Sequence, residues 1–279
     1  MRTLLRTQLL AFACLAQLAA QTSQPAARIA SWPKLDGKQQ ARVEKVFENM
    51  ARPDEALRTA AEQELAAFGA GAAPLCLQRL SDFPTNINPG LYRVLDQITV
   101  AEHAPLLTSW AKDKRRAIRF WVVERLARFH DRGSEPILRA ATKEKDPEIA
   151  FRAALGLVAL GDVPALDAVF ARCEEQWAEY GPLTLEIVAP GRSQGLADAV
   201  FARGEKGEAR TRITALRLLR ALGTPSLTSK LKPLLDSEDH TIKKETINAL
   251  RVIVDRQPPL EELSVFQEIE MAAEWKKRI

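Results

Sequence analysis

Aromatic residues are scarce in this sequence, at 6% of 279 residues, although hydrophobic residues of all kinds make up 46%. Small aliphatic side chains therefore supply most of the available core. Such side chains suit helices packed closely on helices better than a β-sandwich, which is rich in Val, Thr and Tyr. The composition predicts an all-α protein that is long enough to bury a large core.

Cysteine is also scarce, because Cys76 and Cys173 are the only thiols apart from Cys14 near the N-terminus. Two widely separated cysteines do not build a disulfide scaffold, so the fold must be stabilised by packing. Neither cysteine has the Cys-x-x-Cys or Cys-His spacing of a zinc or haem-attachment site. We expect both to be buried and to behave as small hydrophobic residues.

Catalytic and metal-binding patterns are missing as well. His103, His130 and His240 lie far apart and lack i, i+4 partners that would complete a metal site, which indicates solvated or capping roles. The sequence contains no Gly-rich phosphate loop, no Gly-x-Ser-x-Gly elbow and no His-Glu-x-x-His motif. We therefore expect a non-catalytic protein without a metal or a cofactor.

An excess of one charge sign is absent too, since the formal net charge is only +4. Without Arg2 and Arg6, which lie in the N-terminal segment described next, 38 basic residues face 36 acidic ones, a net charge of +2. Nucleic-acid binding requires a clustered basic footprint, so the bulk charge does not indicate it.

The first twenty residues have the layout of a secretory signal peptide. They contain two arginines and no acidic residue, and an apolar run extends from Leu9 to Ala20. This run is shorter than the roughly 20 residues that span a membrane. We predict a signal peptide over 1–20, a flexible polar leader over 21–35, a folded body over 36–279, and export to the periplasm of a bacterial envelope or to the medium. An amphipathic first helix or an uncleaved anchor is the alternative.

The stretch from Asp146 to Gly161 has the pattern of one helix with a defined start and end. Asp146 can accept backbone N–H hydrogen bonds as the N-cap, and Pro147 suits the first helical position. Gly161 is suited to the left-handed conformation that ends many helices. Similar stretches recur, because an acidic residue is followed fifteen positions later by glycine at Asp54–Gly69, Asp146–Gly161 and Glu208–Gly223.

These stretches are copies of a repeating unit. Weaker copies start at Asp113 and Asp239, and two divergent units lie near 88–100 and 179–189, which gives a period of about 31 residues and about seven units. Proline is tolerated only in the first turn of a helix, and it marks a second helix at Pro74, Pro105, Pro136, Pro164, Pro225 and Pro258 or Pro259. The pattern predicts an α-solenoid, a superhelix of about seven stacked antiparallel helix pairs.

Within the repeating unit, Asp146 is followed by Arg152-Ala153-Ala154 and Leu160-Gly161-Asp162, and Asp113 and Arg119 have the same spacing in another unit. These residues resemble HEAT repeats of the short kind that is also found in phycobilisome lyases. Other units depart from the pattern, because Ala60, Thr214 and Glu245 stand in place of the arginine. The resemblance covers about 36–258. It implies an array that binds another protein along its concave face.

The last segment, from Leu260 to Ile279, has the pattern of an amphipathic helix. We expect it to be the final inner helix and the cap of the solenoid, with basic residues near its C-terminus. The face expected to be buried consists of Leu260, Leu263, Phe266, Ile269 and Ala273.

The densest basic run lies between Lys112 and Arg132 and continues on the next helix. One interpretation is a docking surface for an acidic partner or a polyanion, and the other is a solvated face with interspersed acidic residues. Trp177 stands among glutamates in a divergent unit, a place suited to binding, although packing is the simpler role for it. The candidate partner-binding residues are Arg115, Arg116, Arg119, Arg139, Lys143, Arg172 and Trp177.

The sequence thus favours an exported, non-catalytic scaffold that binds another protein, which we expect to be acidic. Two other functions stay open. One is an enzyme accessory or lyase-like protein that acts on a prosthetic group, and the other is nucleic-acid or polyanion binding through basic patches. The predicted export disfavours nucleic acid. A second basic cluster, from Lys206 to Lys244, has the same two interpretations as the first.

Overall fold

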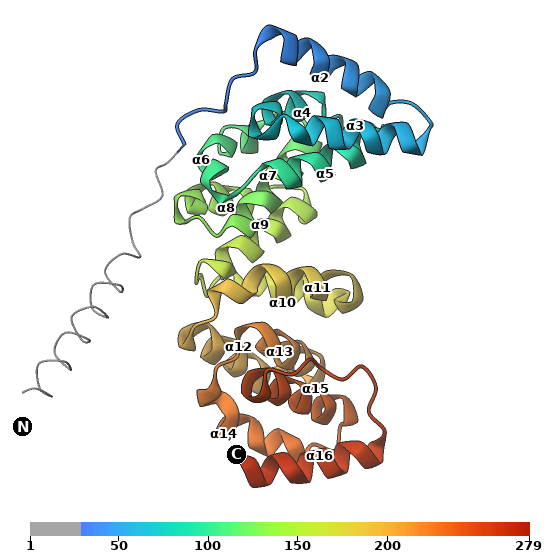
Figure 1. The fold of residues 1–279 in the computed structure, drawn as a ribbon. Helices are drawn as coiled ribbons and strands as arrows, with labels where there is room; N and C mark the ends of the chain where they lie inside the picture. The colour runs from blue at the N-terminus through green and yellow to red at the C-terminus, as the bar shows by residue number, and fades with distance from the viewer. Residues whose placement is uncertain (1–28) are drawn as a thin grey trace, which may run out of the picture.

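The computed structural model describes residues 29–279, and every regular element among them is a helix (Figure 1). The helices stack in one elongated column that runs from α2 at one end to α16 at the other. This confirms the all-α solenoid that the sequence predicted. The predicted signal peptide and residues 21–28 of the predicted leader lie outside the described residues.

Seven helix pairs make up the column, preceded by the single helix α2 (Gly37–Met50). The first helices of the pairs are α3 (Glu55–Ala67), α5 (Asn88–Ile98), α7 (Arg116–Phe129), α9 (Pro147–Ala159), α11 (Trp177–Val188), α13 (Ala209–Leu222) and α15 (His240–Leu250). The second helices are α4 (Ala73–Arg79), α6 (Ala104–Leu107), α8 (Glu135–Ala141), α10 (Leu166–Glu175), α12 (Gln194–Lys206), α14 (Thr228–Leu231) and α16 (Val265–Arg278). The first helices start about 31 residues apart, as predicted. No helix within residues 29–279 is long and apolar enough to cross a membrane.

The ends of α9 follow the sequence signals. The Asp146 carboxylate accepts hydrogen bonds from the backbone N–H groups of Glu148 (2.9 Å) and Ile149 (3.3 Å), and Gly161 has a φ of +97°. The copy from Glu208 to Gly223 differs, because Glu208 makes no side-chain cap and Gly223 has a φ of −65°. A Cβ at Gly223 would collide with the side chain of Ile253, so this glycine permits close packing and not a left-handed turn.

The predicted prolines open three of the second helices, with Pro74, Pro105 and Pro136 in the first turns of α4, α6 and α8. Pro164 lies two residues before α10, and Pro225 begins the 3-10 segment η6 (Pro225–Leu227) that leads into α14. The last unit is different, since α16 begins at Val265, well after Pro258 and Pro259. The loop before α16 is held instead by Asn248, whose side chain exchanges hydrogen bonds with the backbone of Leu260 at 2.7 and 3.0 Å.

The core runs through the whole column and contains both cysteines that the sequence expected to be buried. Cys76 and Cys173 are free thiols with no exposed surface. Burial raises the pKa of the Cys76 thiol to about 12, which keeps it protonated and unreactive at neutral pH. Burial also raises the pKa of Cys173, whose sulfur lies 3.3 Å from the hydroxyl of Thr184.

The buried face of α16 was predicted wrongly. Phe266 and Ile269 are 70% and 55% exposed, and the buried residues are Glu268, Ala272 and Trp275. Trp275 offers a larger apolar surface than Phe266, so burying its indole fixes the rotation of the helix. The Glu268 carboxylate on the same face contacts the His240 ring at 3.1 Å.

Residues 29–35 lie against the column, in contrast to the flexible tether that the sequence suggested for this stretch. The ring of Trp32 stacks on His103 at 5.1 Å between centroids, and Leu35 packs on the core beside Gly71. His103 is only 6% exposed, and its Nδ1 accepts a hydrogen bond from the Val100 N–H at 3.0 Å. Of the two roles expected for the histidines, solvated or capping, His103 thus has the capping one.

Acid should weaken the contact between Trp32 and His103. Burial lowers the pKa of His103, so the neutral ring contributes stability that is fully present above about pH 6.5 and is lost as the pH falls through the folded-state pKa. We expect the thermal unfolding midpoint to fall more steeply between about pH 7 and about pH 5 in the native protein than in a His103→Gln variant. Parallel midpoint curves for the two proteins would contradict this expectation.

Candidate interaction surfaces

Arginine–carboxylate pairs connect the first helix of one pair with the first helix of the next. The pairs of this arginine ladder are Arg93–Glu62 (2.6 Å), Arg125–Asp96, Arg152–Glu124 (2.7 Å) and Arg217–Glu245 (2.9 Å). Trp121 adds a hydrogen bond of 2.8 Å from its indole N–H to Asp96. The partners lie close to one repeat apart in sequence, so the period of the solenoid brings them together.

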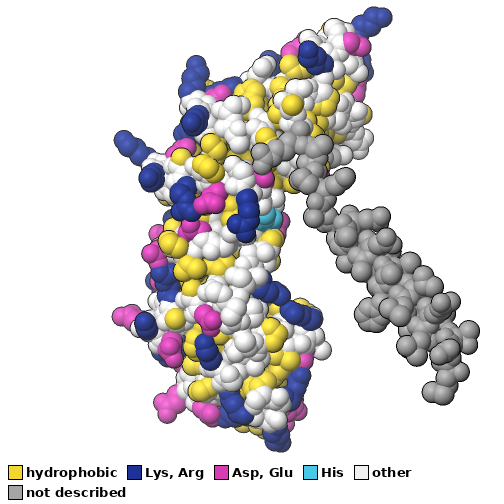
Figure 2. All heavy atoms as spheres, turned by 90° about the vertical axis from the view of Figure 1, so that its left-hand side faces the viewer, with side chains coloured by type: hydrophobic (Ala, Val, Ile, Leu, Met, Phe, Trp, Pro, Cys, Tyr) yellow, Lys and Arg dark blue, Asp and Glu magenta, His cyan; other side chains and the backbone are white. Residues whose placement is uncertain are grey.

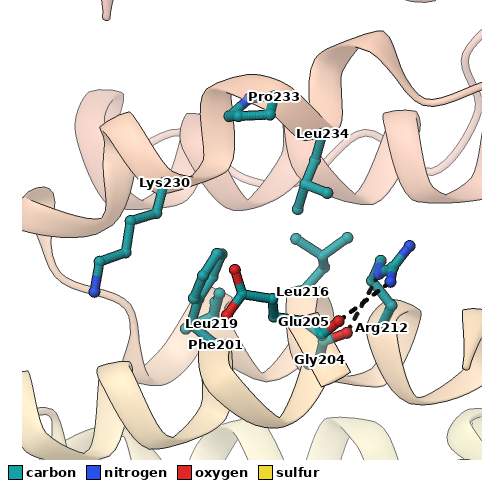
Figure 3. A pocket seen from close by; sticks show the side chains of 10 residues that line it. Phe201, Gly204, Glu205, Arg212, Leu216, Leu219, Lys230, Pro233 and Leu234 are labelled. Atoms are coloured by element: carbon teal, nitrogen blue, oxygen red, sulfur yellow. Dashed lines mark hydrogen bonds between the residues drawn. The ribbon is translucent and has the colours of Figure 1, made fainter. Parts of the chain in front are cut away.

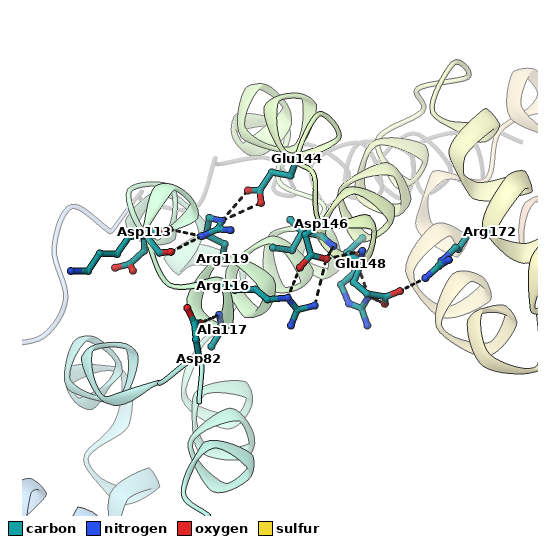
Figure 4. A network of polar contacts seen from close by, with 12 residues as sticks. Asp82, Asp113, Arg116, Ala117, Arg119, Glu144, Asp146, Glu148 and Arg172 are labelled. Atoms are coloured by element: carbon teal, nitrogen blue, oxygen red, sulfur yellow. Dashed lines mark hydrogen bonds and ion pairs between the residues drawn. The ribbon is translucent and has the colours of Figure 1, made fainter. Parts of the chain in front are cut away.

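The predicted docking residues at the start of α7 also have partners within the chain (Figure 4). Arg115 pairs with Asp113 at 3.0 Å and donates to the carbonyl oxygen of Gln78 at 2.7 Å. Arg116 pairs with Asp146, the residue that caps α9, and Arg119 pairs with Glu144 at 3.1 Å. Arg115 thus contacts α4, Arg116 contacts the start of α9, and Arg119 contacts the turn between α8 and α9.

Arg172 belongs to a dense cluster between α9, α10 and α11. It pairs with Glu148 and with Glu175, and it donates to the Tyr180 hydroxyl at 2.7 Å. Burial raises the pKa of Glu148, but hydrogen bonds from Arg172 and other donors outweigh that effect, so the pKa lies below its usual range. Burial and the hydrogen bond to Glu148 raise the pKa of Tyr180 to about 12. The cluster is therefore a fixed ionic contact at neutral pH.

The other predicted residues lie apart from this cluster. Arg139 pairs with Glu135 and with Asp162, both at 2.6 Å, although half of its side chain is exposed. The Trp177 ring is half-buried and lies over Gly181, while the Arg217 guanidinium is 5.1 Å from its centroid. Lys143 is exposed and makes no ion pair with any residue from 29 to 279, and Lys112 and Lys114 share these properties.

The described residues hold no group of His, Cys, Asp and Glu that could bind a metal. His130 has its Nε2 3.1 Å from the carbonyl oxygen of Ile187, and His240 contacts Glu268. Both histidines thus make polar contacts with residues of another helix.

Three grooves open along the edge of the column that carries the second helices, and we call this edge the second-helix edge. Figure 2 views the column from this side and shows hydrophobic side chains between acidic and basic ones. The first groove, of about 150 Å³, lies between Trp110–Lys112 and α8. The second, of about 390 Å³, lies between α10 and α12. The third, of about 230 Å³, lies between α12 and the 3-10 segment η7 (Lys232–Asp236) that follows α14.

The third groove has an apolar floor and a charged mouth (Figure 3). Leu216 and Leu219 of α13 form its floor, between Phe201 of α12 and Leu234 of η7. The Lys230 ammonium lies at the mouth, 5.8 Å from the centroid of the Phe201 ring and 2.9 Å from Asp198.

Two cationic side chains line each groove, namely Lys112 and Arg119 in the first, Arg203 and Lys206 in the second, and Arg212 and Lys230 in the third. Glu144 and Glu205 line the first and third grooves as well, and Arg119, Arg203 and Lys230 have carboxylate partners within the chain. The sequence marked both basic clusters but not the grooves, because a groove depends on the spacing between helices. One signal was available, namely the small residues Ala199 and Ala202, which leave room at the wall of the second groove.

A family model of HEAT repeats matches residues 104–180, in agreement with this architecture. No curated protein matches the sequence. Among solved structures, human deoxyhypusine hydroxylase in complex with glycerol is similar over 86% of this chain and 97% of its own, at 16% identity and a TM-score of 0.34. The chain is thus an all-helical repeat protein whose residues 104–180 are similar to HEAT repeats.

Proposed function

We propose that this protein is a non-catalytic binding module that holds an extended segment of another protein along its second-helix edge. One observation carries the proposal: a largely apolar groove lined by two cationic side chains recurs at three junctions between second helices. A helical array offers the same kind of site at successive repeats, which suits a long and irregular partner.

The grooves define the chemistry of the segment. Their apolar walls would take a large aliphatic or aromatic side chain, the kind of anchor that dominates protein interfaces. Lys206 is exposed and has no carboxylate partner within residues 29–279, so it is available to an acidic residue next to the anchor. Such charges contribute mainly to specificity and to the rate of association.

The spacing of the second and third grooves sets the spacing of the anchors. These two grooves lie on opposite sides of α12, and packed helices are about 8–10 Å apart. An extended chain advances about 3.3 Å per residue, so three residues cover this distance. We expect a segment with large apolar residues at positions i and i+3 and with acidic residues around them.

Selection from random displayed peptides tests this proposal. We expect acidic peptides with the i, i+3 apolar pair, and we expect the double variant Lys206→Glu with Lys230→Glu to bind them about tenfold or more weakly. Ala202→Trp, which fills the second groove, should weaken binding without changing the charge. The matched control is Lys38→Glu with Lys45→Glu on α2, which makes the same change of charge outside the grooves. Selected peptides that bind all variants equally would contradict the proposal.

The basic run near Lys112 remains a second candidate, and its exposed lysines supply the observation in its favour. Charge reversal of Arg115, Arg119 or Arg139 would also remove contacts within the array, and Lys112 lines the first groove, so the variant that tests this candidate alone is Lys114→Glu with Lys143→Glu. Loss of an acidic partner in this variant would support docking there. An affinity for nucleic acid that falls steeply with salt would instead support polyanion binding.

Two further proposals come from the sequence. The pattern of residues 1–20 supports export to a bacterial periplasm or the medium, and N-terminal sequencing of the mature protein would show whether cleavage follows Ala20. The resemblance to the short repeats of phycobilisome lyases supports a role as an enzyme accessory that acts on a prosthetic group. A visible spectrum that is unchanged when a tetrapyrrole is added would count against this role.

A further inference from the structure

Residues 29–35, which we call the strap, have no regular secondary structure and run from the start of α2 toward α6 (Figure 1). Apolar residues recur at every third position of the strap. Ile29, Trp32 and Leu35 are half-buried, whereas the residues between them are exposed. An extended left-handed helix has three residues per turn, and Pro33 favours that conformation for the residue before it. The three apolar side chains thus lie on one side of the strap.

Two of these side chains each contact one helix pair. Leu35 packs on the 3-10 segment η1 (Gly69–Ala72), which leads into α4 of the first pair. Trp32 stacks on His103 of the 3-10 segment η2 (Ala101–His103), which leads into α6 of the second pair. Packed helices are about 8–10 Å apart, and three extended residues cover about the same distance. One apolar anchor in every three residues therefore matches one helix pair.

The column is shaped to receive these two anchors. A Cβ added at Gly71 would lie 2.9 Å from a methyl carbon of Leu35 and 3.0 Å from the carbonyl oxygen of Pro33, so the missing side chain lets the strap come this close. The hydrogen bond from the Val100 N–H fixes the His103 ring, which faces the indole at an interplanar angle of 16°. Both features belong to the column and not to the strap, and together they form a site for an extended segment.

The strap is held in this site mainly by side chains. Within residues 29–279, one hydrogen bond joins the strap to the rest of the chain, from the side-chain amide of Gln40 to the carbonyl oxygen of Leu35 at 3.0 Å. A segment with few buried contacts and little hydrogen bonding opens at a low cost in free energy. Another extended segment with the same two side chains at the same spacing would make the same contacts.

We propose that η1 and η2 form a peptide-binding site that the strap occupies, and that a segment of a partner protein with an aromatic residue three positions before a leucine displaces the strap. Gly71 and His103 line none of the three grooves, so this site is separate from those of the proposed function. The strap is attached to α2 and competes at an effective concentration of about a millimolar. The partner segment consequently has a lower apparent affinity for the native chain than for a chain whose strap lacks its anchors.

A peptide with the sequence of residues 29–36, added to the full chain, tests the site. The strap variant for this test is Trp32→Ser with Leu35→Ser, which removes both anchors and leaves the column unchanged. We expect the peptide to bind the strap variant at least about tenfold more tightly than the native chain. A peptide in which Lys34 and Leu35 are exchanged places the anchors two residues apart and should not bind detectably.

Variants of the column locate the binding. In the strap variant, Gly71→Ala should weaken binding of the peptide at least about tenfold, because the added Cβ fills the space of the leucine anchor. Gly37→Ala is the matched control, since a Cβ there would meet no atom within 4 Å. Lys206→Glu with Lys230→Glu should leave this binding unchanged, so a failure of the grooves to bind peptides would not affect the result. A peptide that does not bind the strap variant, or that binds whatever its anchor spacing, would overturn the proposal even if Gly71→Ala did not fold.

Trypsin cleavage after Lys34 tests displacement of the strap in the native chain. Cleavage requires that the strap opens locally, so its rate reports the open population. The peptide with Lys34→Gln contains no trypsin site, and an excess of it should raise the cleavage rate at Lys34 severalfold, toward that of the strap variant. The same peptide with Trp32→Ala should have no effect. An unchanged rate at a peptide concentration that saturates the strap variant would show that the strap is not displaced and would overturn the proposal.

Discussion

Replacing Gly156 by alanine should destabilise the protein, although alanine is the better helix former. Gly156 lies in α9 where that helix crosses α7, and a Cβ added there would be 2.8 Å from both the Cα and the Cβ of Ala127. Overpacking of a core costs about 1–3 kcal/mol, with the upper end expected where backbone atoms must move. The gain in helix propensity is at most about 1 kcal/mol. The steric cost therefore exceeds the gain in helix propensity, and the thermal midpoint should fall by several degrees.

Gly195→Ala is the matched control for Gly156→Ala. Gly195 lies in the first turn of α12, and an added Cβ would meet no atom within 4 Å. Alanine should therefore leave the stability unchanged or raise it by up to about 1 kcal/mol. Thermal unfolding of the three proteins measures both effects. Equal midpoints for the two variants would show that α7 and α9 are less closely packed than the structure indicates.

The repeat period was predictable because it rests on local signals. Asp146, Pro147 and Gly161 define the ends of α9 by backbone chemistry that involves only a few neighbouring residues. Copies of these signals elsewhere in the chain were enough to count the pairs. The rotation of α16 was not predictable in this way, because it depends on whether Trp275 or Phe266 is buried against α15 and η7. That competition between two apolar faces is decided by tertiary contacts.

The ion-pair partners of the arginines could have been predicted from the sequence. Arg93 and Glu62 are 31 residues apart, and Arg116 and Asp146 are 30 apart, which is one repeat in each case. In a solenoid, residues one period apart lie side by side, so opposite charges at that spacing predict an ion pair. The basic run near Arg116 consequently acts in large part as a connection between repeats. The sequence was enough to infer that these arginines pair with carboxylates of the same chain. It was not enough to infer the grooves beside them.

The second large effect is expected at Glu245, whose side chain is 5% exposed. Glu245 is the common partner of Arg217 and Arg220, and the side chains of these arginines are 24% and 14% exposed. Burial and the charge of Arg217 lower the pKa of Arg220 to about 10. Glu245→Ala would leave two largely buried cations without a carboxylate. Such a change costs about 3–5 kcal/mol.

Two variants separate this effect from the general loss of an ion pair. Glu175→Ala removes one of the two carboxylate partners of Arg172, a carboxylate that is 65% exposed, and it should change the stability by less than about 0.5 kcal/mol. Arg220→Leu combined with Glu245→Leu removes both buried charges and should recover most of the loss, while Arg217 keeps its contact with Trp177. A double variant as unstable as Glu245→Ala would show that packing, and not charge, dominates at this site.

The damage caused by Glu245→Ala should also be local, because each repeat of a solenoid contacts mainly its neighbours. Hydrogen exchange should accelerate in α13, α15 and α16 and change little in α3 and α5. Gly156→Ala lies at the middle of the column and should instead loosen α7 and α9 while protection at both ends persists. If the C-terminal units open in this way, the floor of the third groove, formed by Leu216 and Leu219, becomes disordered as well. Glu245→Ala should therefore weaken the binding of a peptide side chain in the third groove. The contacts that the peptide makes with Lys206 and the second groove should persist.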